Sequence, residues 1–599
     1  MLIQPYDPRN IRTGYEIPSE GYCDQPYVVV NDDGSWTCVM TTGPGHEGAA
    51  GQHVVTTRSE DQGKTWSTPV DVEPSDGPEA SYAVLLRIPS GRLFCFYNHN
   101  TDNVREVIAD DPPFTGGKCR RVDSLGYHVF RYSDDCGRSW SAKRFALPIR
   151  QMDIDRKNPF GGNIQFFWNV GKPFVHEGAA YISVHKVGGF GEGFFTRSEG
   201  VLLRSDNLLT ETDPEKVHWE TLPEGDFGLR TPPGGGPIAE EQSYAALSDG
   251  SFFSVYRTID GHPAYAYSRD AGRTWSEPRY MQYADGRLMK HPRAANFVWK
   301  CSNGKHLYWF HNHGGNGYED RNPAWLCGGV ETDSPEGKVI KWSQPEIVLY
   351  DDDPCIRMSY PDLVEQDGKY FLTETQKLTA RVHEVDPSLL QGLWSQFESA
   401  GEAREGLVLD LPCGDSPIPS EIDAPPLPVF LSHDSFNRAF GTKNLRTGFS
   451  LDLRVRFDDL SHGQVLLDNW SETTKGLCLQ TTTRGTLEIV LNDGRTESRW
   501  DCDPWMLEEG REHHVVINVD GGPSIVTFIT DGKLCDGGEH RQFGWGRFNP
   551  NLQDVNGGKI LRIAPRLNGK LICLRMYGRA LRTSEAVGNF RAGRTKGLR

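Results

Sequence analysis

Three copies of one octet constrain the fold of this chain more than any other feature. The pattern is Ser-x-Asp-x-Gly-x-x-Trp, and it runs from Ser59 to Trp66, from Ser133 to Trp140 and from Ser268 to Trp275. In each copy we expect the aspartate to accept backbone N–H groups, the glycine to supply a positive φ and the tryptophan to pack against the hairpin end. A degraded fourth copy runs from Ser205 to Trp219. The octets therefore predict a repeated β unit.

A second repeat gives the number of units. A short turn that ends in glycine precedes an apolar or aromatic run six times within about 400 residues. The six glycines are Gly34, Gly91, Gly178, Gly250, Gly304 and Gly368. Each copy is a hairpin signal. Six hairpin-bearing units predict an all-β, six-bladed β-propeller of four-stranded sheets over residues 1–410.

The composition changes after residue 410. Residues 412–428 contain six prolines in seventeen positions, which is typical of a stiff linker, so residues 411–425 are expected to join two domains. Alternating runs such as FSLDLRVRF and HHVVINVDGG follow. They predict a β-sandwich of the jelly-roll type over residues 426–599.

Composition excludes several classes of function. The chain has 599 residues with 64 Lys and Arg against 81 Asp and Glu, a net charge of −17, so nucleic acid is not an expected partner. No apolar run approaches the ~18 residues of a membrane helix. The first residues resemble no secretory signal, and the thirteen cysteines form no CxxC pair, so we expect mostly reduced thiols and a cytoplasmic location. The chain lacks P-loop, dinucleotide and HExxH motifs, so no cofactor is expected.

The octets resemble the Asp-boxes of the sialidase-like six-bladed propellers, and the resemblance covers roughly residues 15–400. The C-terminal part resembles a laminin-G or concanavalin-like domain. The residues that carry this second resemblance are His513 to Gly521, Asp531-Gly532-Lys533 and Arg575 to Leu581. The family implies a glycoside hydrolase with its site at one end of the propeller axis.

Several residues match the family's site. Glu241 lies sixteen residues before Arg257, just upstream of the octet at Ser268, and Arg321 follows at the expected distance. Tyr360 precedes the Asp367-Gly368 hairpin. The resemblance implies that Tyr360 is a nucleophile whose proton Glu241 accepts. It also implies that Arg257 and Arg321 bind an anionic group of the substrate.

The chain departs from the family at two places. The Arg-Ile-Pro element that opens the carboxylate-binding triad is replaced by Cys23-Asp24-Gln25, and the later Arg87-Ile88-Pro89 is out of register with it. The family's acid is missing from the loop over residues 41–53, where His46, Glu47 and His53 are the proton-transfer candidates. We therefore expect Asp24, Glu47 and His46 to act in catalysis, and His53 and Gln25 to contact substrate.

A histidine-rich stretch, His311 to Tyr318, is expected to form a loop that contacts the sugar through His313. His-Asn-His spacing alone is a weak metal signal, and no metal site is expected.

These features predict an exo-acting glycoside hydrolase that acts on an acidic or decorated glycan. Two alternatives stay open: a propeller polysaccharide lyase acting on a uronate-containing glycan, and a non-catalytic carbohydrate-binding protein. Carbohydrate is the expected partner, and the sequence leaves the oligomeric state open. Asp24 in place of an arginine removes a contact and adds a like charge, together about 5 kcal/mol, so we expect little or no sialidase activity.

Overall fold

The computed structural model describes residues 7–110, 117–120, 123, 126–191, 194–315, 317–318, 321–411, 417–430 and 448–596. The chain divides into two compact units. The propeller unit comprises Gly14–Trp342 and Pro354–Pro387. The sandwich unit comprises the N-terminal segment up to Thr13, Ser343–Asp353 and the chain from Ser388 onward.

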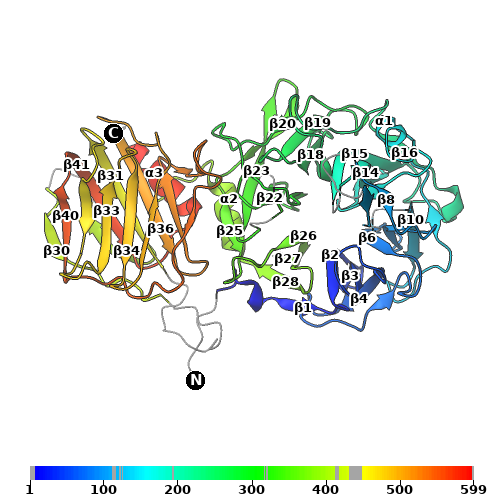
Figure 1. Cartoon of the computed structure of the whole chain (residues 1–599), viewed down its shortest axis with the longest axis horizontal. Helices are drawn as coiled ribbons and strands as arrows, with labels where there is room; N and C mark the ends of the chain where they lie inside the picture. Colours follow the sequence, from blue (N-terminus) through cyan, green and yellow to red (C-terminus); the bar gives the residue numbers. More distant parts are fainter. Residues whose placement is uncertain are drawn as a thin grey trace. The chain divides into compact units, whose positions relative to one another are not determined.

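The propeller unit contains six antiparallel sheets, one per blade, which follow one another around a ring from blue to green in Figure 1. Blade 1 is β2 (Tyr22–Val30), β3 (Trp36–Gly43), β4 (His53–Ser59) and β5 (Val70–Asp71). Blade 2 is β6 (Ala80–Arg87), β7 (Leu93–His99), β10 (Tyr127–Ser133) and β11 (Phe145–Ala146). Blade 3 is β12 (Phe167–Trp168), β14 (Ala179–Phe190), β15 (Phe195–Ser205) and β16 (Glu220–Leu222), with β13 (Phe174–His176) also paired to β14.

The second half of the ring repeats this order. Blade 4 is β17 (Glu240–Ala246), β18 (Phe252–Arg257), β19 (Ala264–Ser268) and β20 (Arg279–Tyr280). Blade 5 is β21 (Phe297–Lys300), β22 (His306–Phe310), β23 (Ala324–Ser334) and β24 (Gly337–Trp342). Blade 6 is β26 (Ser359–Gln366), β27 (Lys369–Thr375) and β28 (Ala380–Val385), completed by β1 (Tyr15–Ile17) from the start of the chain. This pairing joins the start of the propeller unit to its last blade and so closes the ring.

Both repeats have the local structure that their residues predict. Every glycine of the six hairpins has a positive φ, between 74° and 88°, and each lies between the first two strands of its blade. In the octet at Ser268, Gly272 N and Thr274 N donate to Ser268 Oγ and Asp270 Oδ1 at 2.8 and 2.9 Å. The octets at Ser59 and Ser133 make the same two bonds. The six-bladed propeller that the repeats predict is therefore confirmed.

Side chains from non-adjacent blades meet at the centre of the propeller. Tyr27 of blade 1 donates to the carbonyl of Val170 in blade 3 at 2.7 Å, and its ring lies 6.4 Å from that of Phe297 in blade 5. Lys172 of blade 3 forms an ion pair with the buried Asp362 of blade 6 at 2.8 Å. The axis is thus a packed core at this level, and a ligand can enter only from an end of the propeller.

The sandwich unit contains two antiparallel sheets. One has the order β29 (Leu407–Leu411), β41 (Gly569–Tyr577), β31 (Phe449–Phe457), β36 (Glu512–Asp520), β37 (Ile525–Thr530) and β38 (Lys533–Leu534), with β39 (Gly546–Arg547) also paired to β37. The other has the order β30 (Glu421–Asp423), β40 (Ile560–Arg566), β32 (Val465–Asp468), β33 (Gly476–Thr481), β34 (Leu487–Asn492) and β35 (Glu497–Asp501). Alternating side chains such as Leu451, Leu453 and Ile517 fill the core. The all-β class and the C-terminal β-sandwich are confirmed.

The domain boundaries differ from those expected. Residues 411–425 were expected to form a linker, but β29 pairs with β41 and β30 pairs with β40. Each is the edge strand of its sheet, where prolines before and after a short strand do not interrupt a ladder. Residues 412–416 lie outside the described residues. The sandwich unit therefore begins before the proline-rich segment.

Helices are short in the described residues. The α-helices are α1 (Asp153–Arg156), α2 (Pro387–Ser395) and α3 (Thr583–Lys596), and two 3₁₀ helices span Ile11–Thr13 and Pro214–Lys216. Within the described ranges, none of them is long and apolar enough to span a membrane. Cys573 is disulfide-bonded, whereas the thiols of Cys23 and Cys38 are free.

Candidate active site

An irregularity shared by four blades places the candidate residues. In β17, Glu240 pairs with Arg257 and Ser243 pairs with Val255. The chain therefore advances three residues on β17 but only two on β18, which is a β-bulge. The inner strands of blades 1, 2 and 6 carry the same bulge. At the equivalent position of each bulge the backbone has a positive φ, at Gln25, Tyr82, Glu241 and Tyr360. Such conformations are strained for residues other than glycine and redirect a side chain out of the regular pleat.

The bulges of blades 4 and 6 bring the two central residues together. Tyr360 Oη donates to Glu241 Oε1 at 2.9 Å, and both side chains are buried. The other oxygen of Glu241, Oε2, accepts from Arg257 Nη1 at 2.8 Å. Glu241 N donates to His185 Nδ1 at 3.0 Å, which ties this strained residue to blade 3. Three predicted residues, Tyr360, Glu241 and Arg257, therefore form one hydrogen-bonded chain.

The surroundings keep Tyr360 protonated in the resting state. Burial and the neighbouring charge of Glu241 raise the pKa of the Tyr360 phenol well above its ordinary value. Burial disfavours the charge of Arg257, but the carboxylates of Glu241 and Glu240 more than compensate and raise its pKa. Glu241 Oε1, which accepts the hydrogen bond of this phenol, lies within reach of its proton.

Two further arginines surround Arg257. Arg293 Nε donates to Glu240 Oε1 at 3.2 Å, and Arg257 Nε approaches the same oxygen at 3.1 Å. Arg321 donates to Ser359 Oγ at 2.8 Å, and burial followed by the charge of Arg257 lowers the Arg321 pKa. The guanidinium groups of Arg257 and Arg293 lie within 4.5–5.7 Å of the rings of Phe194 and Tyr318. The arginine cluster Arg257, Arg293 and Arg321 is thus the cationic half of the site.

An acidic half faces blade 6 from blade 1. Asp24 is fully buried and accepts from Lys377 Nζ at 2.6 Å and from Tyr22 Oη at 2.8 Å. Glu47 Oε2 lies 3.5 Å from the same ammonium group, which itself lies 4.4 Å from the centre of the Tyr360 ring. Burial raises the pKa of Asp24 to about 6, with Lys377 opposing the shift and Glu47 adding to it. This half includes a predicted pair, Asp24 and Glu47, and the unpredicted Lys377.

Tyr82 and Asp123 extend the acidic half. Tyr82 Oη donates to Glu47 Oε1 at 3.3 Å and also to the buried carboxylate of Asp123. The Tyr82 ring stacks on Trp168 with the ring centres 3.8 Å apart. Tyr82 occupies the same bulge position as Glu241 and Tyr360, so a comparison of the inner strands could have identified it. No comparable signal marks Asp123.

Other predicted residues contact different parts of the propeller unit. Gln25 is buried and donates to the carbonyl of Asn169 at 3.1 Å, behind Asp24. His53 lies 3.5 Å from Glu20 and from Asp71 within blade 1. These contacts give Gln25 and His53 structural partners, and their roles toward a substrate stay predictions.

The expected roles of His46 in catalysis and of His313 in sugar binding also stay predictions. His46 is exposed, and its carbonyl accepts from Ala49 in a turn. His313 is buried. Burial lowers the pKa of His291 to about 3, and the charges of Arg257 and Arg321 act in the same direction.

The alternative arginine of the Arg-Ile-Pro sequence is not at the site. Arg87 ends β6 at the hairpin of Gly91 and forms an ion pair with Asp32. The bulge residue Tyr82 lies near the other end of the same strand. Arg87 therefore lies out of register with the bulge positions, as the sequence predicts.

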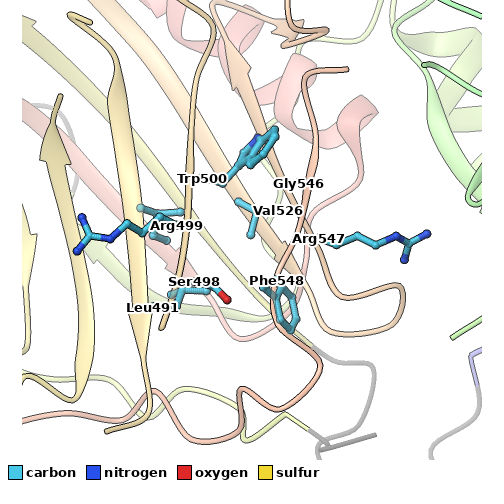
Figure 2. Close-up of a pocket in the computed structure, with 9 residues that line it drawn as sticks. Leu491, Ser498, Arg499, Trp500, Val526, Gly546, Arg547 and Phe548 are labelled. Carbon is cyan, nitrogen blue, oxygen red and sulfur yellow. The ribbon is translucent and has the colours of Figure 1, made fainter. Parts of the chain in front are cut away.

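Two cavities lie away from this cluster. The first is in the sandwich unit, between Trp500, Val526 and Phe548, and Figure 2 shows Arg499 and Arg547 pointing away from it on opposite sides. Its volume of about 10 Å³ has room for about one water molecule, which excludes a sugar. The second, of about 580 Å³, is a groove beside the first octet, lined in part by Arg58, Trp66 and Arg138. Neither contains a residue of the predicted site.

Within the described ranges, no group of three or more His, Cys, Asp or Glu side chains is placed to hold a metal ion.

No protein-family model and no curated protein matches the chain. Solved structures of sialidases are similar to it at low identity. The Trypanosoma rangeli sialidase with 2,3-difluorosialic acid, a covalent intermediate, is 14% identical over 98% of this chain and 97% of that chain, with a TM-score of 0.42. The NanB sialidase of Streptococcus pneumoniae is 14% identical over 64% and 70%, with a TM-score of 0.43. The intramolecular trans-sialidase of Ruminococcus gnavus is 15% identical over 62% and 96%, with a TM-score of 0.42. Similarities this low transfer neither activity nor substrate.

Proposed function

We propose that the protein is an exo-acting glycoside hydrolase that cleaves a glycan with an acidic substituent through a tyrosyl intermediate. The observation that carries this proposal is the buried hydrogen bond of 2.9 Å from Tyr360 Oη to Glu241 Oε1. A phenol beside a carboxylate that can take its proton is an activated nucleophile. Both residues lie at positive φ in the bulges of their strands, and their side chains meet there.

The first step follows from the positions of these groups. The Tyr360 oxygen forms a bond to the anomeric carbon while its proton passes to Glu241, and the bond from that carbon to the aglycone oxygen breaks. The aglycone oxygen takes a proton from the acidic half, where Asp24 has a pKa of about 6. Glu47 is the more accessible of the two carboxylates, because 26% of its side chain is exposed whereas Asp24 has none.

The second step reverses the proton transfers. Water attacks the anomeric carbon of the glycosyl-tyrosine, and the bond from that carbon to the Tyr360 oxygen breaks. The acidic half accepts a proton from the water, and Glu241 returns its proton to the Tyr360 oxygen. Two displacements at one carbon retain the anomeric configuration. Retention is therefore part of the proposal.

The charges of the two halves favour one orientation of the substrate. The arginine cluster carries three positive charges against the two carboxylates of Glu240 and Glu241, and it faces the site from blades 4 and 5. The acidic half carries Asp24 and Glu47 against Lys377. An anionic substituent is therefore expected beside the arginines, with the leaving group toward Glu47.

Sialic acid is expected to be a poor substrate. Where the family has an arginine, this chain has the ion pair of Asp24 and Lys377, which has no net charge. The lysine offsets part of the repulsion expected from Asp24, but it adds no free cation for a carboxylate. Arg293 is a third arginine in the cluster, but it comes from a different position than the arginine that the family has in blade 1. The cluster is therefore expected to bind an anionic group in a different geometry.

The test is a screen of fluorogenic glycosides that carry glucuronic acid, sulfated sugars, sialic acid or neutral sugars. Product analysis by mass spectrometry and NMR identifies the bond and the anomer released. Turnover that is lost in Tyr360→Phe supports the proposal. A product that absorbs in the ultraviolet because it is unsaturated would show a lyase, and sugar binding without turnover would show a lectin-like protein.

A further inference from the structure

We propose that Lys377 is a positioning residue, which holds the carboxylates of Asp24 and Glu47 in place for proton transfer to the leaving group and thereby determines the pH range of activity. The inference rests on the proposed function. Lys377 lies in the turn between β27 and β28, outside the motifs that the sequence singles out. Its contacts distinguish it from an ordinary surface lysine.

The backbone of Lys377 is fixed in a strained conformation. Its φ is 73°, which is unfavourable for a residue with a Cβ. Lys377 N donates to Thr375 Oγ1 at 2.9 Å, and Lys377 O accepts from Cys23 N of blade 1 at 2.9 Å. The first bond is local to the turn, and the second ties the turn to the start of β2, one residue before Asp24. The structure therefore maintains a strained turn to place this side chain.

The ammonium group bridges a buried and an accessible carboxylate. Its nitrogen lies 2.6 Å from Asp24 Oδ2 and 3.5 Å from Glu47 Oε2. About 20% of the Lys377 side chain is exposed, so it lies at the boundary between the buried couple and solvent. It also lies 4.4 Å from the centre of the Tyr360 ring. One cation thus joins both candidate proton donors to the nucleophile.

The groups that face Asp24 define the electrostatic effect of Lys377. They are Tyr22 and Cys23 on its own strand, Lys377 from blade 6 and Glu47 from the loop after β3, with Tyr360 and Asp123 further away. Among the described residues, Lys377 is the cation that contacts Asp24 directly. An opposite charge this close lowers the pKa of a carboxyl by roughly 1–3 units. Without Lys377, the couple would keep its proton to a higher pH.

The test compares the pH dependence of kcat/KM for wild type, Lys377→Met and Lys377→Arg, using the substrate that the screen identifies. In Lys377→Met the alkaline limb should move upward by at least about one pH unit, with a lower maximum. Lys377→Arg keeps the charge and should leave the limb within a few tenths of a unit. Lys369→Met is the matched control, because Lys369 lies on the same blade and forms an exposed ion pair with Glu384. Its profile should equal that of wild type.

A second readout separates this inference from the proposed function. The unfolding free energy is measured against pH for wild type and Lys377→Met, which requires no turnover. Because Asp24 has a raised pKa in the folded state, its stabilising effect is lost as pH rises through about 6, and in Lys377→Met that loss should occur at higher pH. An unmoved stability profile overturns the inference whether or not the protein is an enzyme. If the stability profile shifts but the screen finds no turnover, the electrostatic role of Lys377 is supported and the hydrolase proposal is contradicted. If the alkaline limb of kcat/KM does not shift in Lys377→Met, the positioning role of Lys377 in catalysis is overturned.

Discussion

Glu241→Gln tests the proton acceptor with a change of one functional group. Both Glu241 oxygens accept hydrogen bonds, one from Tyr360 Oη and one from Arg257 Nη1. Breaking a buried ion pair costs about 3–5 kcal/mol, and Arg257 keeps Glu240 as a partner, so the loss of unfolding free energy should be near the lower end, about 3 kcal/mol. A domain with about 5–15 kcal/mol of stability stays folded after such a loss.

The effect on turnover should be much larger than the effect on folding. The amide cannot accept the Tyr360 proton, so kcat/KM should fall by about 10²–10⁴-fold. Tyr360→Phe should reduce it at least as much, and the double variant should be no worse, because the two residues act as a unit. Stability is measured by urea unfolding and turnover with the glycoside that the screen identifies.

Glu240→Gln is the matched control. Glu240 is the neighbouring residue and is equally buried, but its carboxylate pairs with Arg257 and Arg293 rather than with Tyr360. Glu240→Gln should lose a similar amount of unfolding free energy, but its kcat/KM should fall far less than that of Glu241→Gln. Equal losses of turnover in both variants would refute the reasoning, since they would show that any disturbance of Arg257 is sufficient.

Three further predictions follow from the charges and the repeats. Asp24 has a folded pKa of about 6 against an ordinary 3.8, so the unfolding free energy of wild type relative to Asp24→Asn should fall by about 2 kcal/mol from pH 4 to pH 7; a difference independent of pH would contradict the shift. Arg293→Met should lower kcat/KM for an acidic glycoside by about 10–100-fold and leave its neutral analogue nearly unchanged, which initial rates on both substrates test. Asp270→Ala removes bonds from Thr274 N and Thr274 Oγ1, so chemical denaturation should show a loss of about 1–3 kcal/mol with unchanged kcat; a changed kcat would refute a purely structural octet.

The sequence predicted the features that depend on local chemistry. Positive φ at a hairpin glycine such as Gly250 and side-chain bonds within the octet at Ser268 involve residues a few positions apart. The family resemblance identified Glu241 and Arg257 through their spacing, and the two residues lie on adjacent strands of one blade. Tyr360 was identified only by resemblance, since 119 residues separate it from Glu241.

The residues that were missed reach the site through the packing of different blades. Arg293 precedes β21 and joins the cluster through Glu240 of blade 4, and Lys377 reaches Asp24 across 353 residues. No periodicity encodes such contacts. The proline-rich segment was misinterpreted for a related reason: composition does not distinguish a linker from the edge strands β29 and β30, which are defined by partners more than a hundred residues later.

The most direct test of the central claim is to trap the glycosyl-enzyme. Wild type and Tyr360→Phe are incubated with a panel of activated fluorinated glycosyl fluorides that includes glucuronyl, galactosyl and sialyl members. Intact-protein mass spectrometry followed by peptide mapping then locates any adduct. We predict a single glycosyl group on Tyr360 of wild type and none on the variant. Turnover of a glycoside by wild type without such an adduct, or an adduct on another residue that persists in Tyr360→Phe, would contradict the assignment of Tyr360 as the nucleophile.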